Sequence, residues 1–154
     1  MVKKMNLDIK FIPTAKGKTV NKPFYATEGS AGMDLSACID EPVLLKKGEI
    51  VFIPTGIAIS LPNEKYGAFL FARSGLASKH GITLANCVGV VDSDYTGEIK
   101  VGLINLSNEE YIVTNGERIA QMVIMPVAQA NLTVVDELEE TERGSGGFGS
   151  TGAY

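Results

Sequence analysis

Alternating apolar and polar residues mark two stretches of the chain as half-buried β-strands. Residues 7–11 and 98–103 change between apolar and polar at each step, which is the two-residue period of a strand with one face toward the core. Denser apolar runs, short and rich in β-branched residues, indicate strands buried between two sheets. These runs are residues 50–53, 57–61, 68–72, 88–91 and 119–125.

Turn-forming residues separate the apolar runs. Residues 46–49, 61–64 and 114–117 each contain Gly, Pro or Asn, which favour tight turns. The pair Asn115-Gly116 is the strongest hairpin signal in the chain, so we expect a hairpin there. The best helical candidate is one or two turns near residues 74–80. Many short, closely spaced strands predict an all-β sandwich or barrel.

Length and composition indicate one globular domain. The chain has 154 residues, of which 45% are hydrophobic and 21% are charged, as in ordinary globular proteins. Its formal net charge of −4 argues against binding a long nucleic acid but not against a small polyanion held by a few donors. No apolar run approaches the roughly 20 residues of a membrane span, and no signal peptide opens the chain. We therefore expect a cytoplasmic protein with no membrane or nucleic-acid partner.

Cysteine and histidine usage limits the possible chemistry. Cys38 and Cys87 lie among apolar residues and outside any C-x-x-C pair, so we interpret both as buried free thiols, with a disulfide or a reactive thiol as the alternative. His80 is the single histidine and is interpreted as a loop residue. A histidine-rich metal site is therefore impossible, and a carboxylate is the expected general base.

Two segments offer polar groups where packing does not need them. Arg73, Ser74 and Gly75 follow an apolar run and supply a guanidinium fork, a hydroxyl and an open backbone, which suit an oxyanion. An ordinary turn at a strand end is the alternative. Asp34 lies in a small, apolar stretch, where an unpaired carboxylate is unfavourable. It either bonds to nearby backbone or serves a site.

Two further segments carry polar groups at or within apolar runs. Residues 88–91 are followed by Asp92 and Tyr95. Asp92 can accept a proton and Tyr95 can pack on a sugar. A capped β-turn is the alternative explanation for both residues. Asp92 and Asp94 without histidine make a poor metal cage. Strand alternation places Gln121 on the same face as Ile119, and a buried amide there needs hydrogen-bond partners.

The C-terminal residues differ in composition from the rest. Residues 136–142 are acidic, and residues 143–152 contain five glycines. We therefore divide the chain into a β-barrel domain, residues 1–135, and a flexible arm, residues 136–154. The arm lacks the lysine, strand and helix of a P-loop. Phe148, the one aromatic among residues 143–152, can cover a flat ring, but the linker interpretation stays open.

Five motifs in order support a family assignment. They are AGMDLSA, ARSGLA, GVVDSDYTGE, ERIAQ and RGSGGFGSTG. From about residue 7 to 152 the chain resembles the trimeric dUTPase family. The resemblance implies a jelly-roll or distorted β-barrel subunit and a homotrimer with composite active sites at subunit interfaces. It also implies hydrolysis of dUTP to dUMP and pyrophosphate by attack of water on the α-phosphorus, which limits uracil incorporation into DNA and supplies dUMP for thymidylate synthesis.

The resemblance also implies roles for the nucleoside-binding residues. Asp92 would bind the deoxyribose 3′-hydroxyl and orient or activate the attacking water. Tyr95 would pack on the deoxyribose and exclude a 2′-hydroxyl. The backbone from Asn86 to Val91, including Gly89, would read the uracil edge. These roles would give selectivity for both base and sugar.

For the triphosphate, the resemblance implies contacts from other subunits. Arg73, Ser74 and Gly75 of a second subunit would hold phosphate oxygens, and Gln121 would lie near them. Asp34 would orient metal-bound water, because Mg²⁺ is expected on the phosphates with no direct protein ligand. Arg118 is expected to be structural. The arm of a third subunit would supply the remaining contacts, with the aromatic ring over uracil and the others at the distal phosphates: Arg143, Phe148, Gly149, Ser150 and Thr151.

Three alternatives remain open from the sequence. A dCTP deaminase would share the fold, but the intact third motif and the arm count against it. A trimer that binds nucleotide without turnover is a second possibility. An oligomeric structural protein is the third, and it leaves the Phe-containing arm unexplained.

Overall fold

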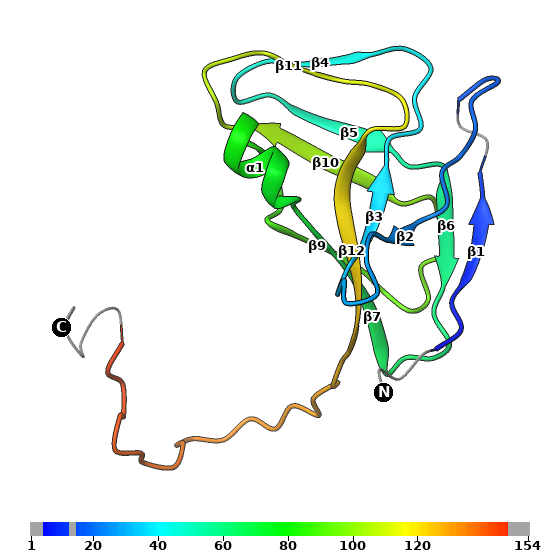
Figure 1. The fold of residues 1–154 in the computed structure, drawn as a ribbon. Coiled ribbons are helices and arrows are strands. Elements are labelled where there is room, and N and C mark those ends of the chain that lie inside the picture. Colours follow the sequence, from blue (N-terminus) through cyan, green and yellow to red (C-terminus); the bar gives the residue numbers. More distant parts are fainter. Residues whose placement is uncertain (1–4, 13–14, 148–154) are drawn as a thin grey trace.

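Strands dominate the structure. A computed structural model describes residues 5–12 and 15–147 (Figure 1). Within these residues lie twelve strands and one helix, α1 (Ser74–His80). The strands are β1 (Asp8–Phe11), β2 (Phe24–Tyr25), β3 (Met33–Ser36), β4 (Val43–Leu45), β5 (Ile50–Pro54), β6 (Ile57–Ser60), β7 (Tyr66–Phe71), β8 (Ile82–Leu84), β9 (Val88–Val91), β10 (Lys100–Asn105), β11 (Tyr111–Val113) and β12 (Arg118–Pro126). The all-β prediction and the short helix are confirmed.

The strands form small antiparallel sheets around one core. The five-stranded sheet has the order β2-β3-β12-β7-β9, and β5-β10-β8 form a second sheet. The pairs β1-β6 and β11-β4 complete the body, and β12 runs through its centre in Figure 1. Apolar side chains from both larger sheets are fully buried between them, including Leu35, Ile53, Leu103 and Met122. The prediction that all the dense apolar runs are buried between two sheets is wrong in part, because β5 and β9 leave Phe52 and Val90 68% and 62% exposed.

The predicted hairpin at Asn115-Gly116 is wrong, although the turn exists. β11 pairs with β4, whereas β12 pairs with β3 and β7. The turn bonds to a distant segment: the Gly116 amide donates to the Ala37 carbonyl (2.8 Å), and the Ile39 amide donates to the Asn115 side chain (3.0 Å). These bonds lead the chain from one sheet into another, so the flanking strands do not pair.

A bulge in β12 overturns the predicted face of Gln121. Arg118 pairs with Ser36, but Ala120 pairs with Leu35, so β12 has one extra residue at this point. The bulge interrupts the two-residue alternation. Ile119 and Ala120 are consequently both buried, and Gln121 is only half-buried. The glutamine therefore does not take the place of a core residue.

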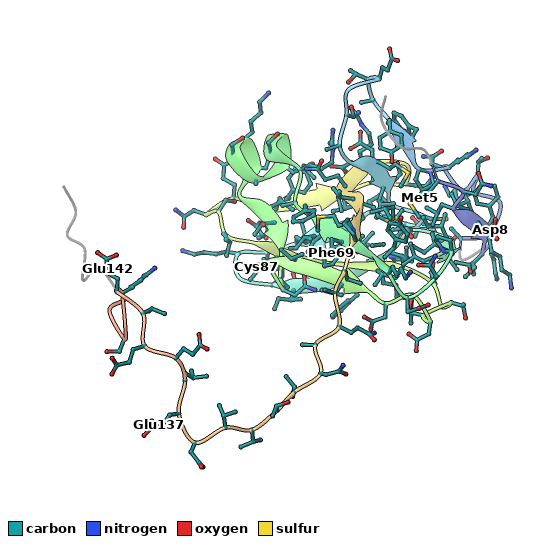
Figure 2. The ribbon with its side chains drawn as sticks, turned by 90° about the horizontal axis from the view of Figure 1, so that it is seen from below. Met5, Asp8, Phe69, Cys87, Glu137 and Glu142 are labelled. Carbon is teal, nitrogen blue, oxygen red and sulfur yellow. The ribbon has the colours of Figure 1, made fainter. Side chains whose placement is uncertain are left out.

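Beyond β12 the chain leaves the body. Residues 128–145 are all exposed, and Figures 1 and 2 show them extending away from the sheets, with Glu137 and Glu142 far from the labelled Phe69. Leu132 and Val134 are 93% and 98% exposed. The extended segment thus begins before residue 136, where composition placed the arm. No helix in the described part of the chain is long and apolar enough to cross a membrane.

Candidate active site

The larger cavity opens between the ends of the two main sheets. It has a volume of about 530 Å³ and receives residues from β5, β9, β10 and the turn between β8 and β9. Asn86, Gly89, Val91, Asp92 and Tyr95 all line it. The structure therefore brings together the five residues that the sequence assigned to base and sugar binding. We call this hollow the nucleoside cavity, after the role that the resemblance implies for these residues.

Backbone hydrogen bonds fix the turn beneath the nucleoside cavity. The Ala85 amide donates to the Gly102 carbonyl (2.8 Å), and the Cys87 amide donates to the Leu84 carbonyl (3.1 Å). The turn therefore joins β8 of one sheet to β9 of the other. Gly89 fits tightly against its neighbour, because a Cβ atom there would lie 3.0 Å from Leu70 Cβ. A rigid backbone of this kind can recognise a flat base by its edge.

The prediction that both cysteines are buried is half wrong. Cys38 is 2% exposed, but Cys87 is exposed (Figure 2). Cys87 lies in the turn with φ of 61°, so its apolar sequence neighbours belong to the strands on either side rather than to its own surroundings. Both thiols are free in the described structure.

Asp92 stands at the end of β9 with an available carboxylate. Its main-chain carbonyl accepts a hydrogen bond from the Tyr95 amide (3.2 Å), which closes the turn after the strand. Among the described residues, none donates a hydrogen bond to its side chain. Asp92 therefore presents a free acceptor to the cavity, as a general base or a sugar-hydroxyl acceptor requires.

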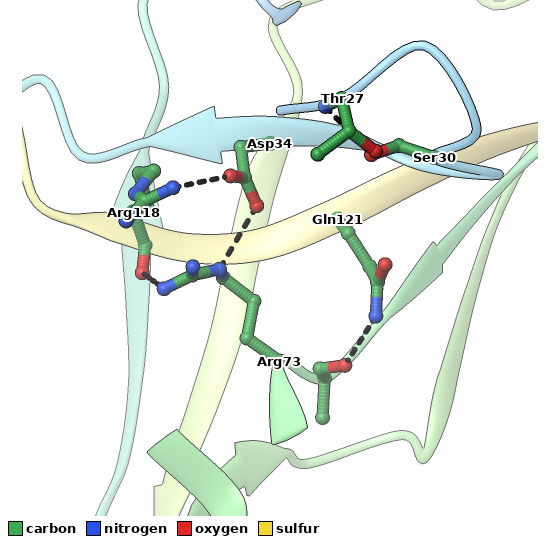
Figure 3. Close-up of polar contacts among 7 residues, drawn as sticks. Thr27, Ser30, Asp34, Arg73, Arg118 and Gln121 are labelled. Atoms are coloured by element: carbon green, nitrogen blue, oxygen red, sulfur yellow. Dashed lines mark hydrogen bonds and ion pairs between the residues drawn. The ribbon is translucent and has the colours of Figure 1, made fainter. Parts of the chain in front are cut away.

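The smaller cavity, of about 280 Å³, collects residues from three neighbouring chain segments. Its polar lining comes from β3, β12 and the junction of β7 with α1 (Figure 3). The predicted site residues that line it are Asp34, Arg73, Ser74, Gly75 and Gln121. Because β3 and β7 both pair with β12, three separate motifs meet here. We call this hollow the anion cavity.

Asp34 bonds to two arginines, not to backbone. Arg73 Nε lies 2.9 Å from one carboxylate oxygen and Arg118 Nη1 lies 2.9 Å from the other (Figure 3). Arg73 Nη1 also donates to the Arg118 carbonyl (3.1 Å). The Asp34 side chain is 12% exposed, whereas the side chains of Arg73 and Arg118 are 26% and 45% exposed, so only the carboxylate is sheltered from water. Two cations against one anion leave a positive excess, which suits an anionic ligand.

Gln121 and Ser74 complete the polar lining. Gln121 Nε2 donates to the Ala72 carbonyl (3.0 Å), so the amide has a structural partner. The amide oxygen of Gln121 packs against Gly32, where the Cβ atom of a larger residue would lie 2.8 Å from Oε1. Ser74 and Gly75 are exposed in the first turn of α1, where backbone N–H groups have no acceptor within the helix. The cavity therefore offers hydroxyl and amide donors beside Arg73.

Tyr111 contacts Glu117 and His80 outside both cavities. Tyr111 donates a short hydrogen bond to the Glu117 carboxylate, and its ring lies 5.1 Å from that of His80. Burial, followed by the bond to Glu117, raises the pKa of Tyr111 to about 12. Glu117 also accepts from the Thr114 amide (3.0 Å). His80 lies outside both cavities, and it is the last residue of α1 instead of the loop residue that the sequence predicted.

The two cavities are separate within one chain. Asp92 and Tyr95 line the first, Arg73 and Gln121 line the second, and their linings share no residue. Arg143 lies near neither, because its Nε donates locally to Gly146 (2.8 Å) on the extended segment. The other predicted arm contacts lie outside the described residues: Phe148, Gly149, Ser150 and Thr151.

Sequence reasoning missed the residues that support Tyr95. Glu98 lines the nucleoside cavity, accepts the Tyr95 hydroxyl on its main-chain carbonyl (2.9 Å) and accepts the Gly56 amide on its carboxylate (3.0 Å). Gly97 and Glu98, two and three positions after Tyr95 in the third motif, were the available signal. Among the described residues, no group of three or more His, Cys, Asp or Glu side chains could hold a metal ion.

Comparison with known proteins gives one consistent family. The dUTPase family model matches residues 18–152. A deoxyuridine 5′-triphosphate nucleotidohydrolase of Desulfitobacterium hafniense is 53% identical, covering 96% of this chain and 97% of that protein. One from Neisseria meningitidis is 57% identical, covering 86% and 88%. The solved structure of Staphylococcus bacteriophage 80alpha dUTPase with dUPNHPP is 30% identical, covers 97% of this chain and 99% of its own, and superposes with a TM-score of 0.84.

Proposed function

Because the chain belongs to the dUTPase family, we propose that it hydrolyses dUTP to dUMP and pyrophosphate. One observation carries the proposal: one cavity presents Asp92 and Tyr95, and a second presents Arg73 with a positive excess. A nucleoside and a triphosphate need these two environments. In the cell the reaction would limit uracil incorporation into DNA and supply dUMP for thymidylate synthesis.

The nucleoside cavity is proposed to select both base and sugar. The backbone from Asn86 to Val91, with Gly89 at its centre, would bond to the uracil edge and leave no room for a thymine methyl group. Tyr95 would pack on the deoxyribose and leave no room for a 2′-hydroxyl. Its support is the hydrogen bond to the Glu98 carbonyl, which holds the ring at the cavity wall.

Asp92 is proposed as the residue that binds the 3′-hydroxyl and activates water. Its carboxylate accepts the proton of the attacking water as the water oxygen bonds to the α-phosphorus. The bond from the α-phosphorus to its bridging oxygen breaks, and pyrophosphate leaves. Positioning and charge stabilisation supply most of the rate enhancement in such a displacement.

The anion cavity is proposed to hold the triphosphate. Arg73, Ser74 and Gly75 would donate to phosphate oxygens, with Gln121 beside them. Asp34 fixes the guanidinium of Arg73 through their 2.9 Å contact. Each carboxylate oxygen has two acceptor positions, so Asp34 can also accept from a metal-bound water. Arg118 holds the opposite oxygen of Asp34 and therefore has a supporting role.

Mg²⁺ is the proposed cofactor, bound to the phosphates. The anion cavity fits this arrangement because its side chains are mainly hydrogen-bond donors and its carboxylate, Asp34, is already bonded to arginines. Arg73 and Ser74 would hold the phosphates that carry the ion. When bound, Mg²⁺ neutralises phosphate charge and makes the phosphorus easier to attack.

A homotrimer is proposed as the active assembly, with composite sites at its interfaces. Two observations favour it: the two cavities are separate within one chain, and the exposed segment 128–145 carries apolar side chains away from its own body. The nucleoside cavity of one subunit would face the anion cavity of a second. The arm of a third subunit, residues 136–154, would close over both cavities. Phe148 would lie on uracil, and the distal phosphates would be bound by Arg143, Gly149, Ser150 and Thr151.

The proposed setting is the cytoplasm, where a free nucleotide is the substrate. The net charge of −4 agrees with a small-molecule partner instead of a nucleic acid.

Pyrophosphate release tests the proposed function. The protein is incubated with Mg²⁺ and, separately, with dUTP, dTTP, dCTP or UTP. We expect release from dUTP alone. Ammonia release from dCTP would instead establish a deaminase, and tight dUTP binding without any product would establish a nucleotide-binding protein without turnover.

A further inference from the structure

We propose that Gly97 is a positioning residue for Tyr95 and thereby sets the preference for dUTP over UTP. The inference deepens the proposed function and rests on it, because it takes the Tyr95 ring as the wall of the sugar site. Gly97 does not itself line the nucleoside cavity. It acts through the ring that does.

The Tyr95 ring occupies the space that any side chain at position 97 would need. A Cβ atom at Gly97 would lie 2.6 Å from Tyr95 Oη, 2.7 Å from Cζ and 3.0 Å from Cε2. The outer end of the ring therefore rests directly on the glycine backbone. Gly97 is not among the described glycines with a positive φ, so its backbone conformation allows alanine. The ring alone requires glycine here.

The backbone that follows Gly97 is anchored and cannot move aside. The Glu98 carboxylate accepts from the Gly56 amide (3.0 Å). The Ile99 carbonyl accepts from the Thr55 hydroxyl (2.6 Å), and the Ile99 amide donates to the Ile57 carbonyl (2.8 Å). Thr55 and Ile99 are each 2% exposed. These bonds attach the segment after Gly97 to the turn between β5 and β6.

A Cβ atom at position 97 is therefore accommodated by movement of the Tyr95 ring. Tyr95 is 47% exposed, and its hydroxyl is held by one bond, to the Glu98 carbonyl (2.9 Å). Ordinary contact begins at 3.4 Å, so a methyl group at position 97 moves the ring end by about 0.8 Å. A 2′-hydroxyl adds a single oxygen to the sugar. The displaced ring therefore alters the wall against which the sugar packs.

Kinetic discrimination tests the proposal. We expect Gly97→Ala to lower the ratio of kcat/KM for dUTP to kcat/KM for UTP at least tenfold, which is a loss of about 1.4 kcal/mol of discrimination. Gly67→Ala is the matched control: its Cβ would lie 3.0 Å from Phe69 Cε2, on β7 and outside both cavities. We expect this control to keep the wild-type ratio. An equal fall of both kcat/KM values in Gly97→Ala would overturn the proposal.

A double variant separates positioning from general damage. If Gly97 acts through Tyr95, then Tyr95→Ala lowers the ratio by itself, and adding Gly97→Ala lowers it no further. Independent, additive losses would contradict the proposal.

The ring position can also be observed without activity. In protein labelled with ¹³C-tyrosine, the Tyr95 ring signal is identified by its loss in Tyr95→Phe. We expect this signal to shift in Gly97→Ala and to stay in place in Gly67→Ala; an unchanged signal in Gly97→Ala would refute the positioning. If the wild type hydrolyses no dUTP, the proposed function fails and the specificity role fails with it, while the ring signal still decides whether Gly97 positions Tyr95.

Discussion

Asp34 shows how one residue can organise a cavity by holding two arginines in place. Its two oxygens bond to Arg73 and Arg118 at 2.9 Å each, so neither arginine side chain is free to rotate away. An ordered guanidinium loses little conformational entropy when it binds a phosphate. The carboxylate that the sequence marked as out of place is therefore explained by the cations that surround it.

Asp92 is the residue on which the proposed chemistry depends. We expect Asp92→Asn to keep dUTP binding but to lower kcat at least a hundredfold, because a general base contributes roughly 10² to 10⁴ in rate. Asparagine has nearly the same shape but does not accept the proton. Steady-state kinetics with a binding measurement on a non-hydrolysable analogue checks this. Asp94→Asn is the matched control, since Asp94 lies two residues on and does not line the cavity; near-normal turnover in Asp92→Asn would end the mechanism.

The raised pKa of Tyr111 predicts that the folded chain loses stability at alkaline pH. Its pKa rises from 10.0 to about 12 in the folded chain, first through burial and then through the bond to Glu117. Below pH 10 the tyrosine keeps its proton in both the folded and the unfolded chain. Between pH 10 and pH 12 the unfolded chain loses this proton more readily than the folded chain, so unfolding becomes more favourable. We therefore expect the urea midpoint to fall as pH rises above about 10 and to fall less in Tyr111→Phe. Equal slopes for both proteins would show that Tyr111 does not contribute.

Among the elements, the strands were predictable and their partners were not. The apolar runs located β5, β6, β7, β9 and β12, but only β6 and β7 are mostly buried. β9 alternates between exposed and buried residues, and β5 buries one residue of five. The failures at Asn115-Gly116 and at Gln121 have one origin: each depends on a distant segment, residues 37–39 in the first case and β3 in the second. A local sequence pattern cannot predict hydrogen bonds to a distant segment.

Asn105 is the buried polar residue that joins two elements. It is 0% exposed, and its Nδ2 donates to the carbonyls of Leu45 (3.0 Å) and Glu109 (2.7 Å). Its Oδ1 accepts from the Ser107 amide (2.9 Å) and hydroxyl (2.8 Å). The end of β10 is thereby attached to β4 and to the loop that leads into β11.

We expect Asn105→Ala to lower the free energy of unfolding by about 3 kcal/mol, because it leaves buried carbonyl groups without donors. Urea unfolding measures the change. Ser107→Ala is the control, since it removes a hydroxyl but leaves both donated bonds of Asn105 in place, and we expect a loss of about 1 kcal/mol or less. Equal losses in the two variants would show that the junction does not depend on Asn105.

At the scale of the whole molecule, the resemblance predicted that the nucleoside and triphosphate contacts come from different subunits. The structure places Asp92 and Arg73 in separate cavities of one chain. That separation depends on which strands pair, because Arg73 follows β7 beside β12 and Asp92 ends β9 at the edge of the same sheet. This arrangement supports the proposal that each active site is assembled from several copies of the chain.

Truncation after Arg143 tests whether the arm serves catalysis or folding. Residues 128–145 are exposed and add nothing to the core. Removing residues 144–154 should therefore leave the urea unfolding midpoint and the assembly unchanged. We expect kcat/KM for dUTP to fall at least a hundredfold, because a segment that closes over the substrate is lost. Sedimentation, urea unfolding and steady-state kinetics on one preparation measure all three. Phe148→Ala, which keeps the full length, should reproduce part of the kinetic loss. If the truncated protein dissociates or unfolds, the arm holds the assembly together, and its loss of activity says nothing about closure over the nucleotide.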